Sequence, residues 1–117
     1  MPSRYTGIEG EMVAQDYLTG IGAQILGTNV ALAGAEIDII ALIDGVYAFV
    51  EVKRRTSTRY GRPAEAVSPA KMRRIIRAAS MYLAMHNISD SPVRFDIIEI
   101  LPGSINHIPG AFDGSMW

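Results

Sequence analysis

The stretch of sequence that decides the fold is residues 36–53, EIDIIALIDGVYAFVEVK. Its two halves, 36–43 and 46–53, are rich in Ile and Val, side chains that favour β-strands. Between them stands Asp44-Gly45, a dipeptide typical of two-residue hairpin turns. The stretch therefore predicts an antiparallel β-hairpin whose register is fixed by its turn.

The predicted register brings four charged side chains to one face of the hairpin. Asp38 is opposed to Glu51 and Glu36 to Lys53, and side chains alternate along each strand. Directly opposed like charges destabilise a sheet, and burying an unpaired carboxylate among apolar residues is costly. A divalent cation between Asp38 and Glu51 would remove the repulsion, and Mg²⁺ prefers oxygen ligands. The spacing favours a metal site; the alternative is an exposed face with an ordinary Glu36–Lys53 salt bridge.

The sequence around the hairpin predicts two helices and three further strands. A capping box at residues 6–9 and an apolar stripe at helical spacing predict a helix over 7–20. Ser68-Pro69 caps a second helix that runs to about residue 86. Further strands are expected over 23–30, 93–100 and 105–108. The order αβββαββ predicts a single α/β domain over residues 1–117, with a mixed central β-sheet flanked by helices.

Composition excludes several other classes of protein. Of the 117 residues, 49% are hydrophobic and 20% charged, which argues against disorder and against a coiled coil. The absence of cysteine excludes disulfides and thiolate metal sites. No apolar run approaches the roughly 20 residues of a membrane span, and the first residues lack a signal-peptide core. We therefore expect a cytoplasmic protein with no membrane partner.

The net charge of −1 hides a strong asymmetry. Nine of the eleven Lys and Arg residues lie within 53–77, opposed there only by Glu65, so this segment carries +8 and the remainder −9. A positive band is a plausible footprint for a phosphate backbone, although a solvated surface is the plain alternative. The predicted partner is a nucleic acid, with DNA favoured over RNA. The residues predicted to contact it are Arg54, Arg55, Arg59, Arg62, Lys71, Arg73, Arg74 and Arg77.

The hairpin also carries a family resemblance. Asp38, twelve residues and then Glu51-Val52-Lys53 resembles the D…(E/D)-x-K signature of the restriction-endonuclease-like superfamily. The whole chain resembles the bacterial YraN-like family, small proteins similar to archaeal Holliday-junction resolvases. The residues that carry this resemblance are Gly10-Glu11, Asn29, 36–41, 49–55, Ala66-Val67, Lys71, Arg94-Phe95-Asp96, His107-Ile108 and Ala111-Phe112.

The resemblance implies a restriction-endonuclease-like core with a phosphodiester-cleaving site that uses Mg²⁺ or Mn²⁺. It implies that Asp38, Glu51 and the Val52 carbonyl are metal ligands and that Lys53 is the catalytic lysine. Glu11 would match a catalytic acid on the first helix, and Lys71 a phosphate contact on the second. The chain departs from the family pattern in two places: Ala35 stands where Gly is usual, and Ala31 where Arg is usual.

These features lead us to expect a metal-dependent nuclease that acts on DNA, including branched or otherwise structured DNA. One alternative is a nucleic-acid-binding module that does not cleave, in which the hairpin acids are structural. Another is a protein-interaction domain whose basic face meets an acidic protein. Resolvase-like action on two opposed strands would favour a two-fold homodimer.

Overall fold

The computed structural model describes residues 7–55 and 67–113. Its element order confirms the predicted αβββαββ arrangement. The elements are α1 (Gly7–Gly20), β1 (Gln24–Leu32), β2 (Ala35–Ile43), β3 (Val46–Arg54), α2 (Pro69–Met85), β4 (Val93–Leu101) and β5 (Ser104–Phe112). The largest difference from the prediction is β5, which extends to Phe112 although Pro109 and Gly110 interrupt its strand-like pattern. No helix within these residues is long and apolar enough to cross a membrane.

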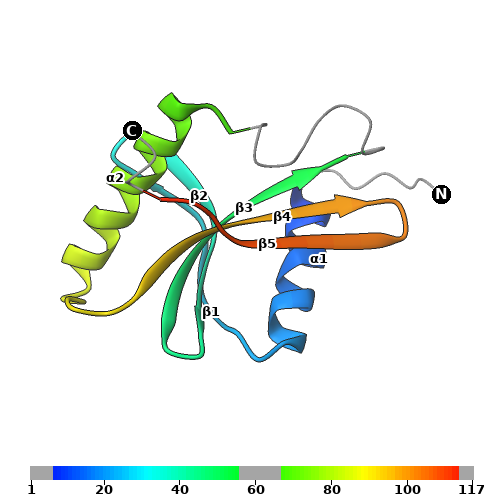
Figure 1. The fold of residues 1–117 in the computed structure, drawn as a ribbon, viewed down its shortest axis with the longest axis horizontal. Coiled ribbons are helices and arrows are strands. Elements are labelled where there is room, and N and C mark those ends of the chain that lie inside the picture. The colour runs from blue at the N-terminus through cyan, green and yellow to red at the C-terminus, as the bar shows by residue number, and fades with distance from the viewer. Residues whose placement is uncertain (1–6, 56–66, 114–117) are drawn as a thin grey trace.

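The five strands form one mixed sheet in the order β1-β2-β3-β4-β5. Neighbouring strands are antiparallel except for β3 and β4, which are parallel. A parallel pair needs a crossover connection, and α2 lies within it. The twisted sheet lies between the two helices (Figure 1). The mixed α/β class with flanking helices is therefore confirmed.

The hairpin register is confirmed close to the turn. Pairs run from Ile43–Val46 to Ile39–Val50, and positive φ angles of 50° at Asp44 and 78° at Gly45 are those that a tight hairpin turn requires. The ladder then ends one residue before Asp38 and Glu51, where the prediction had continued it. The reason is local. The Val52 N–H donates to Asp38 Oδ2 at 2.7 Å, so a carboxylate accepts a bond that a backbone carbonyl would otherwise take.

The α2 helix has one apolar face, which packs against the sheet, and one basic face. Ser68 caps it by accepting a hydrogen bond from the Lys71 N–H, and Pro69 occupies its first turn. Its buried stripe consists of Met72, Ile75, Ala78, Ala79 and Tyr82, which pack against Ile40, Phe49 and Ile97 of the sheet. Arg73, Arg74 and Arg77 are exposed on the other side. The helix therefore carries its arginines on the side that does not pack against the sheet.

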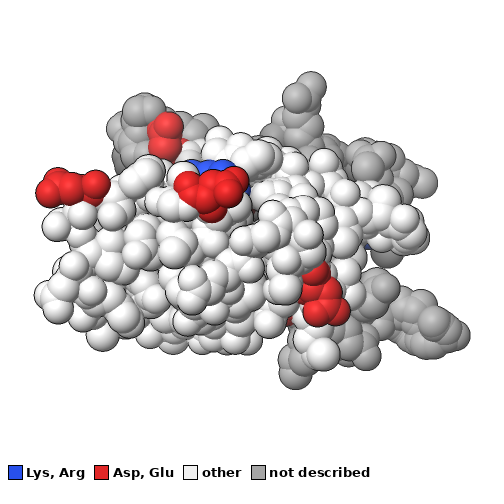
Figure 2. All heavy atoms as spheres, turned by 90° about the horizontal axis from the view of Figure 1, so that it is seen from below, with Lys and Arg blue, Asp and Glu red and all other residues white. Residues whose placement is uncertain are grey.

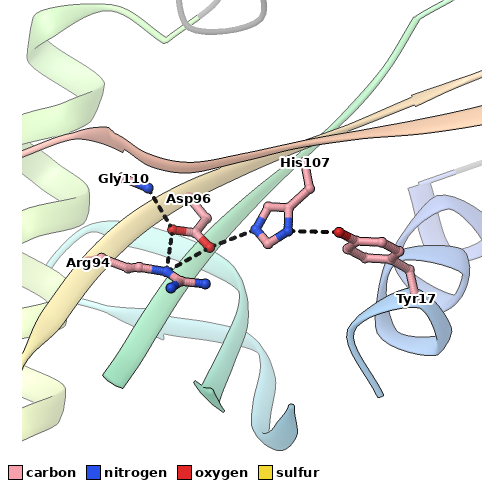
Figure 3. Close-up of polar contacts among 5 residues, drawn as sticks. All are labelled: Tyr17, Arg94, Asp96, His107 and Gly110. Atoms are coloured by element: carbon pink, nitrogen blue, oxygen red, sulfur yellow. Dashed lines mark hydrogen bonds and ion pairs between the residues drawn. The ribbon is translucent and has the colours of Figure 1, made fainter. Parts of the chain in front are cut away.

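A buried polar network joins α1 to strands β4 and β5 of the sheet (Figure 3). The Tyr17 hydroxyl lies 3.0 Å from His107 Nδ1, and His107 Nε2 lies 2.8 Å from Asp96 Oδ2. Asp96 is fully buried, and Arg94 Nε and the Gly110 N–H also donate to it. A buried carboxylate needs such partners, and here they come from β4 and β5, with Tyr17 of α1 joined to the network through His107. The network thus fixes α1 and β5 against β4.

Candidate active site

The acids of the hairpin line an open cleft of about 230 Å³ between the sheet and α2. Its walls come from the β1–β2 turn, from the first half of β2, from Glu51 of β3, and from the first two turns of α2. The lining residues are Gly34, Ala35, Glu36, Asp38, Glu51, Lys71, Arg74 and Ile75. The structure therefore brings together two predicted metal ligands and two of the predicted nucleic-acid contacts.

Glu51 is the more enclosed of the two acids, with 6% of its surface exposed. Its Oε2 atom accepts a hydrogen bond from Lys71 Nζ and lies 3.4 Å from Lys53 Nζ. Lys53 therefore pairs with Glu51 on its own strand, where the exposed-face alternative had required Glu36. An enclosed carboxylate with two ammoniums on one oxygen is not an ordinary surface salt bridge.

Asp38 is half-buried and less well compensated. Burial and then the charge of Glu51 raise its pKa from 3.8 to about 7, although the hydrogen bond from the Val52 N–H acts to lower it. Glu11 also raises this pKa, so the α1 acid acts on Asp38 without lining the cleft. A carboxylate held in this way gains from a nearby cation, because the cation offsets both the burial and the repulsion.

The donor set fits a hard divalent ion that keeps much of its water. Within residues 7–55 and 67–113, no group of three or more His, Cys, Asp or Glu side chains is placed to hold a metal. Two carboxylates in one cleft, beside the Val52 backbone, are nevertheless the number that Mg²⁺ commonly takes from a protein. A fully caged Zn²⁺ or Ca²⁺ site would need more ligands.

Lys71 is closer to the acids than the sequence indicated. Burial acts to lower the pKa of its ammonium, but the hydrogen bond and charge of Glu51, with smaller contributions from Lys53 and Asp38, together raise that pKa. From the sequence, Lys71 was expected only as a phosphate contact on the second helix. The Ser68-Pro69 cap puts it in the first turn, and the packing of α2 on β2 and β3 then brings it over Glu51.

The basic residues of 53–77 divide into groups with different surroundings. The arginines of α2 are exposed, and Arg74 lines the cleft. Arg55 Nε instead lies 3.0 Å from Oε2 of Glu99, an acid with 1% of its surface exposed. The stem of Arg54 covers Gly10 of α1, where an added Cβ would meet Arg54 Cγ and Cδ at 3.1 Å. Arg59 and Arg62 lie outside the described residues.

The charges are also unevenly distributed over the surface. Figure 2 shows a face with separate acidic groups, on which very little Lys or Arg surface is visible among the described residues.

The cleft has a further asymmetry. Ala31, where the resemblance implies Arg, pairs with Glu36 across β1 and β2, so this wall carries an acid opposite a methyl group. The cations that line the cleft, Lys71 and Arg74, both come from α2.

Comparison with known proteins shows the family. Residues 10–100 match the family described as "Uncharacterised protein family UPF0102". A UPF0102 protein of Symbiobacterium thermophilum is 48% identical over 101 residues, covering 86% of each chain. A UPF0102 protein of Clostridioides difficile is 45% identical over 114 residues, covering 96% of this chain and 100% of the relative. The chain therefore belongs to the UPF0102 family, the uncharacterised, YraN-like family that the whole chain resembles.

Proposed function

We propose that this protein is a cytoplasmic, metal-dependent nuclease that hydrolyses phosphodiester bonds in DNA, including branched or otherwise structured DNA. The observation that carries the proposal is the pair Asp38 and Glu51 in one cleft beneath a cationic helix. Buried like charges are costly, so a structure that keeps two of them together favours a function that needs them.

In this proposal Asp38 and Glu51, with the Val52 carbonyl, hold Mg²⁺ or Mn²⁺. The ion would supply Lewis acidity and neutralise charge on the scissile phosphate. Lys53 stays beside Glu51, where its ammonium would face negative charge that develops on the phosphate. Glu11 adds negative charge near Asp38 and thereby strengthens its affinity for a cation.

The substrate class follows from the charges around the cleft. Arg74 lines it, while Arg73 and Arg77 are exposed on the same helix. This row of cations, next to two acids that would hold a metal, suits a polyanionic backbone better than a small substrate. We expect a two-fold dimer to act on both strands, and a monomeric mass by light scattering at high protein concentration would contradict that part.

The test compares wild type, Glu51→Gln and Asp90→Asn on labelled duplexes and four-way junctions with Mg²⁺ or Mn²⁺. Asp90 is an exposed acid outside the cleft with a φ of 57°, a conformation that Asn tolerates, so it controls for loss of one charge. We expect wild type and Asp90→Asn to cleave and Glu51→Gln to lose at least about a hundredfold in rate, the loss typical of removing one catalytic group.

Equal cleavage by wild type and Glu51→Gln, or none by either, would reject the nuclease. The alternatives then separate by binding. A module that only binds nucleic acid would still bind DNA with a steep salt dependence and would be indifferent to Asp38→Asn. Failure to bind nucleic acid at any salt concentration would favour an acidic protein as the partner of the basic face.

A further inference from the structure

Two lysines form ion pairs with Glu51, the most enclosed acid of the cleft. The Glu51 side chain is 7% exposed, whereas those of Lys53 and Lys71 are 25% and 35% exposed. Both ammoniums approach the same oxygen, Oε2, and Lys71 donates a hydrogen bond to it. Enclosed carboxylates require such pairing, so in the metal-free protein these two lysines are the cations paired with Glu51.

Asp38, the other acid, lacks such a partner. Its Oδ2 atom accepts the Val52 N–H, and no ion pair joins Asp38 to a Lys or Arg within the described ranges 7–55 and 67–113. The positive charge therefore gathers on the Glu51 side of the acidic pair. A divalent ion held between the two carboxylates would lie close to that same charge.

The two lysines differ in how readily each can leave. Lys53 lies on β3 two residues after Glu51, on the same face of the strand, so its stem keeps its ammonium near that carboxylate. Lys71 reaches Glu51 from a different element, lines the open cleft and is more exposed. Its flexible four-carbon stem allows the ammonium to turn away while the sheet stays in place.

We propose that the Lys71 ammonium is the resident cation of the acidic pair and that a divalent metal ion enters by displacing it from Glu51. The inference rests on the proposed function, because it takes Asp38 and Glu51 as the ligands of that ion. An ion between the carboxylates repels a neighbouring ammonium, and the cleft is open enough to receive the displaced side chain. Glu51 is then paired with a cation both before and after the metal arrives.

The test measures Mn²⁺ affinity by titration calorimetry in wild type, Lys71→Met and Arg74→Met. Both substitutions remove one positive charge from the cleft lining, but only Lys71 contacts Glu51. Displacement predicts that Lys71→Met binds Mn²⁺ roughly three- to tenfold more tightly than wild type, the size of one charge-assisted contact. Arg74→Met should change the affinity by less than about twofold, because an exposed charge is well screened.

A second readout needs no affinity measurement. In EDTA, Lys71→Met should unfold at a lower temperature than wild type, because Glu51 has lost a cation. Mg²⁺ should then raise the unfolding temperature of Lys71→Met by more than it raises that of wild type. Lys71→Gln replaces Lys71→Met in both measurements if the latter folds poorly. Wild-type affinity equal to or tighter than that of the variant overturns the displacement alone. Absence of Mn²⁺ binding to any of these proteins overturns the metal site, and with it both proposals.

Discussion

Two carboxylates share one cleft, yet their surroundings give them different tasks. Glu51 is enclosed and paired with the ammoniums of Lys53 and Lys71. Burial, and then the charges of Glu51 and Glu11, raise the pKa of Asp38 to about 7, although the hydrogen bond from the Val52 N–H acts to lower it. Near neutral pH, Asp38 is therefore the acid of the pair that gains or loses a proton, and a bound metal ion would favour its ionised form. This difference makes the site sensitive to pH.

Ionisation of Asp38 should destabilise the metal-free protein as pH rises. Between its ordinary pKa of 3.8 and about 7 the folded protein binds a proton that the unfolded chain releases, so the free energy of unfolding falls across that window. Asp38→Asn should remove this fall, and the variant should be more stable than wild type at pH 8 in EDTA. Urea unfolding at pH 5, 6, 7 and 8 measures it, with Asp90→Asn as the control. Parallel pH profiles for wild type and Asp38→Asn would show that Asp38 carries no such penalty.

At the scale of elements, strictly local patterns predicted the hairpin and the bounds of both helices. The Asp44-Gly45 turn fixes the register from Ile43–Val46 to Ile39–Val50, and Ser68-Pro69 fixes the start of α2. Contacts between distant elements escaped prediction. The approach of Lys71 to Glu51 depends on how α2 packs, and the pairing of Arg55 with Glu99 depends on the parallel β3–β4 register.

The network that fixes α1 also escaped prediction, because Tyr17 and His107 are 90 residues apart in sequence. It ties the helix that carries Glu11 to β4 and β5. Among the described residues, its Tyr17–His107 bond is the single side-chain hydrogen bond between α1 and the sheet. We infer that it supports the placement of α1 on this face.

Tyr17→Phe should therefore destabilise the protein by about 0.5–1.5 kcal/mol, the net worth of one intramolecular hydrogen bond. Chemical denaturation measures this, and Tyr47→Phe is the matched control. Tyr47 is also half-buried, and within the described part of the chain its hydroxyl makes no hydrogen bond. Equal stabilities of the two variants would mean that the Tyr17–His107 contact contributes nothing to folding.

At the scale of the whole molecule, a net charge of −1 conceals a basic segment of +8. The structure divides that segment by environment. Arg77 is exposed on α2, whereas Arg55 is 14% exposed and engaged by the buried Glu99. Attraction to a polyanion should therefore depend on the arginines of α2, and Arg55 should serve the fold.

DNA affinity should fall steeply with salt, and Arg77→Gln should lower the slope of log K against log [salt] by about 0.9, the value for one lost phosphate contact. Arg55→Gln should instead lower the free energy of unfolding, since it leaves Glu99 buried without its cation. Fluorescence anisotropy between 50 and 200 mM salt and urea unfolding separate the two effects. An unchanged slope in Arg77→Gln would remove α2 from the binding surface.

The claim that two acids of one hairpin hold a divalent ion is tested most directly by crystals soaked in Mn²⁺. The anomalous difference map should show one peak coordinated by the carboxylates of both Asp38 and Glu51, with the Lys71 ammonium moved away from Glu51. A map with no peak between those carboxylates at saturating Mn²⁺ would contradict the account.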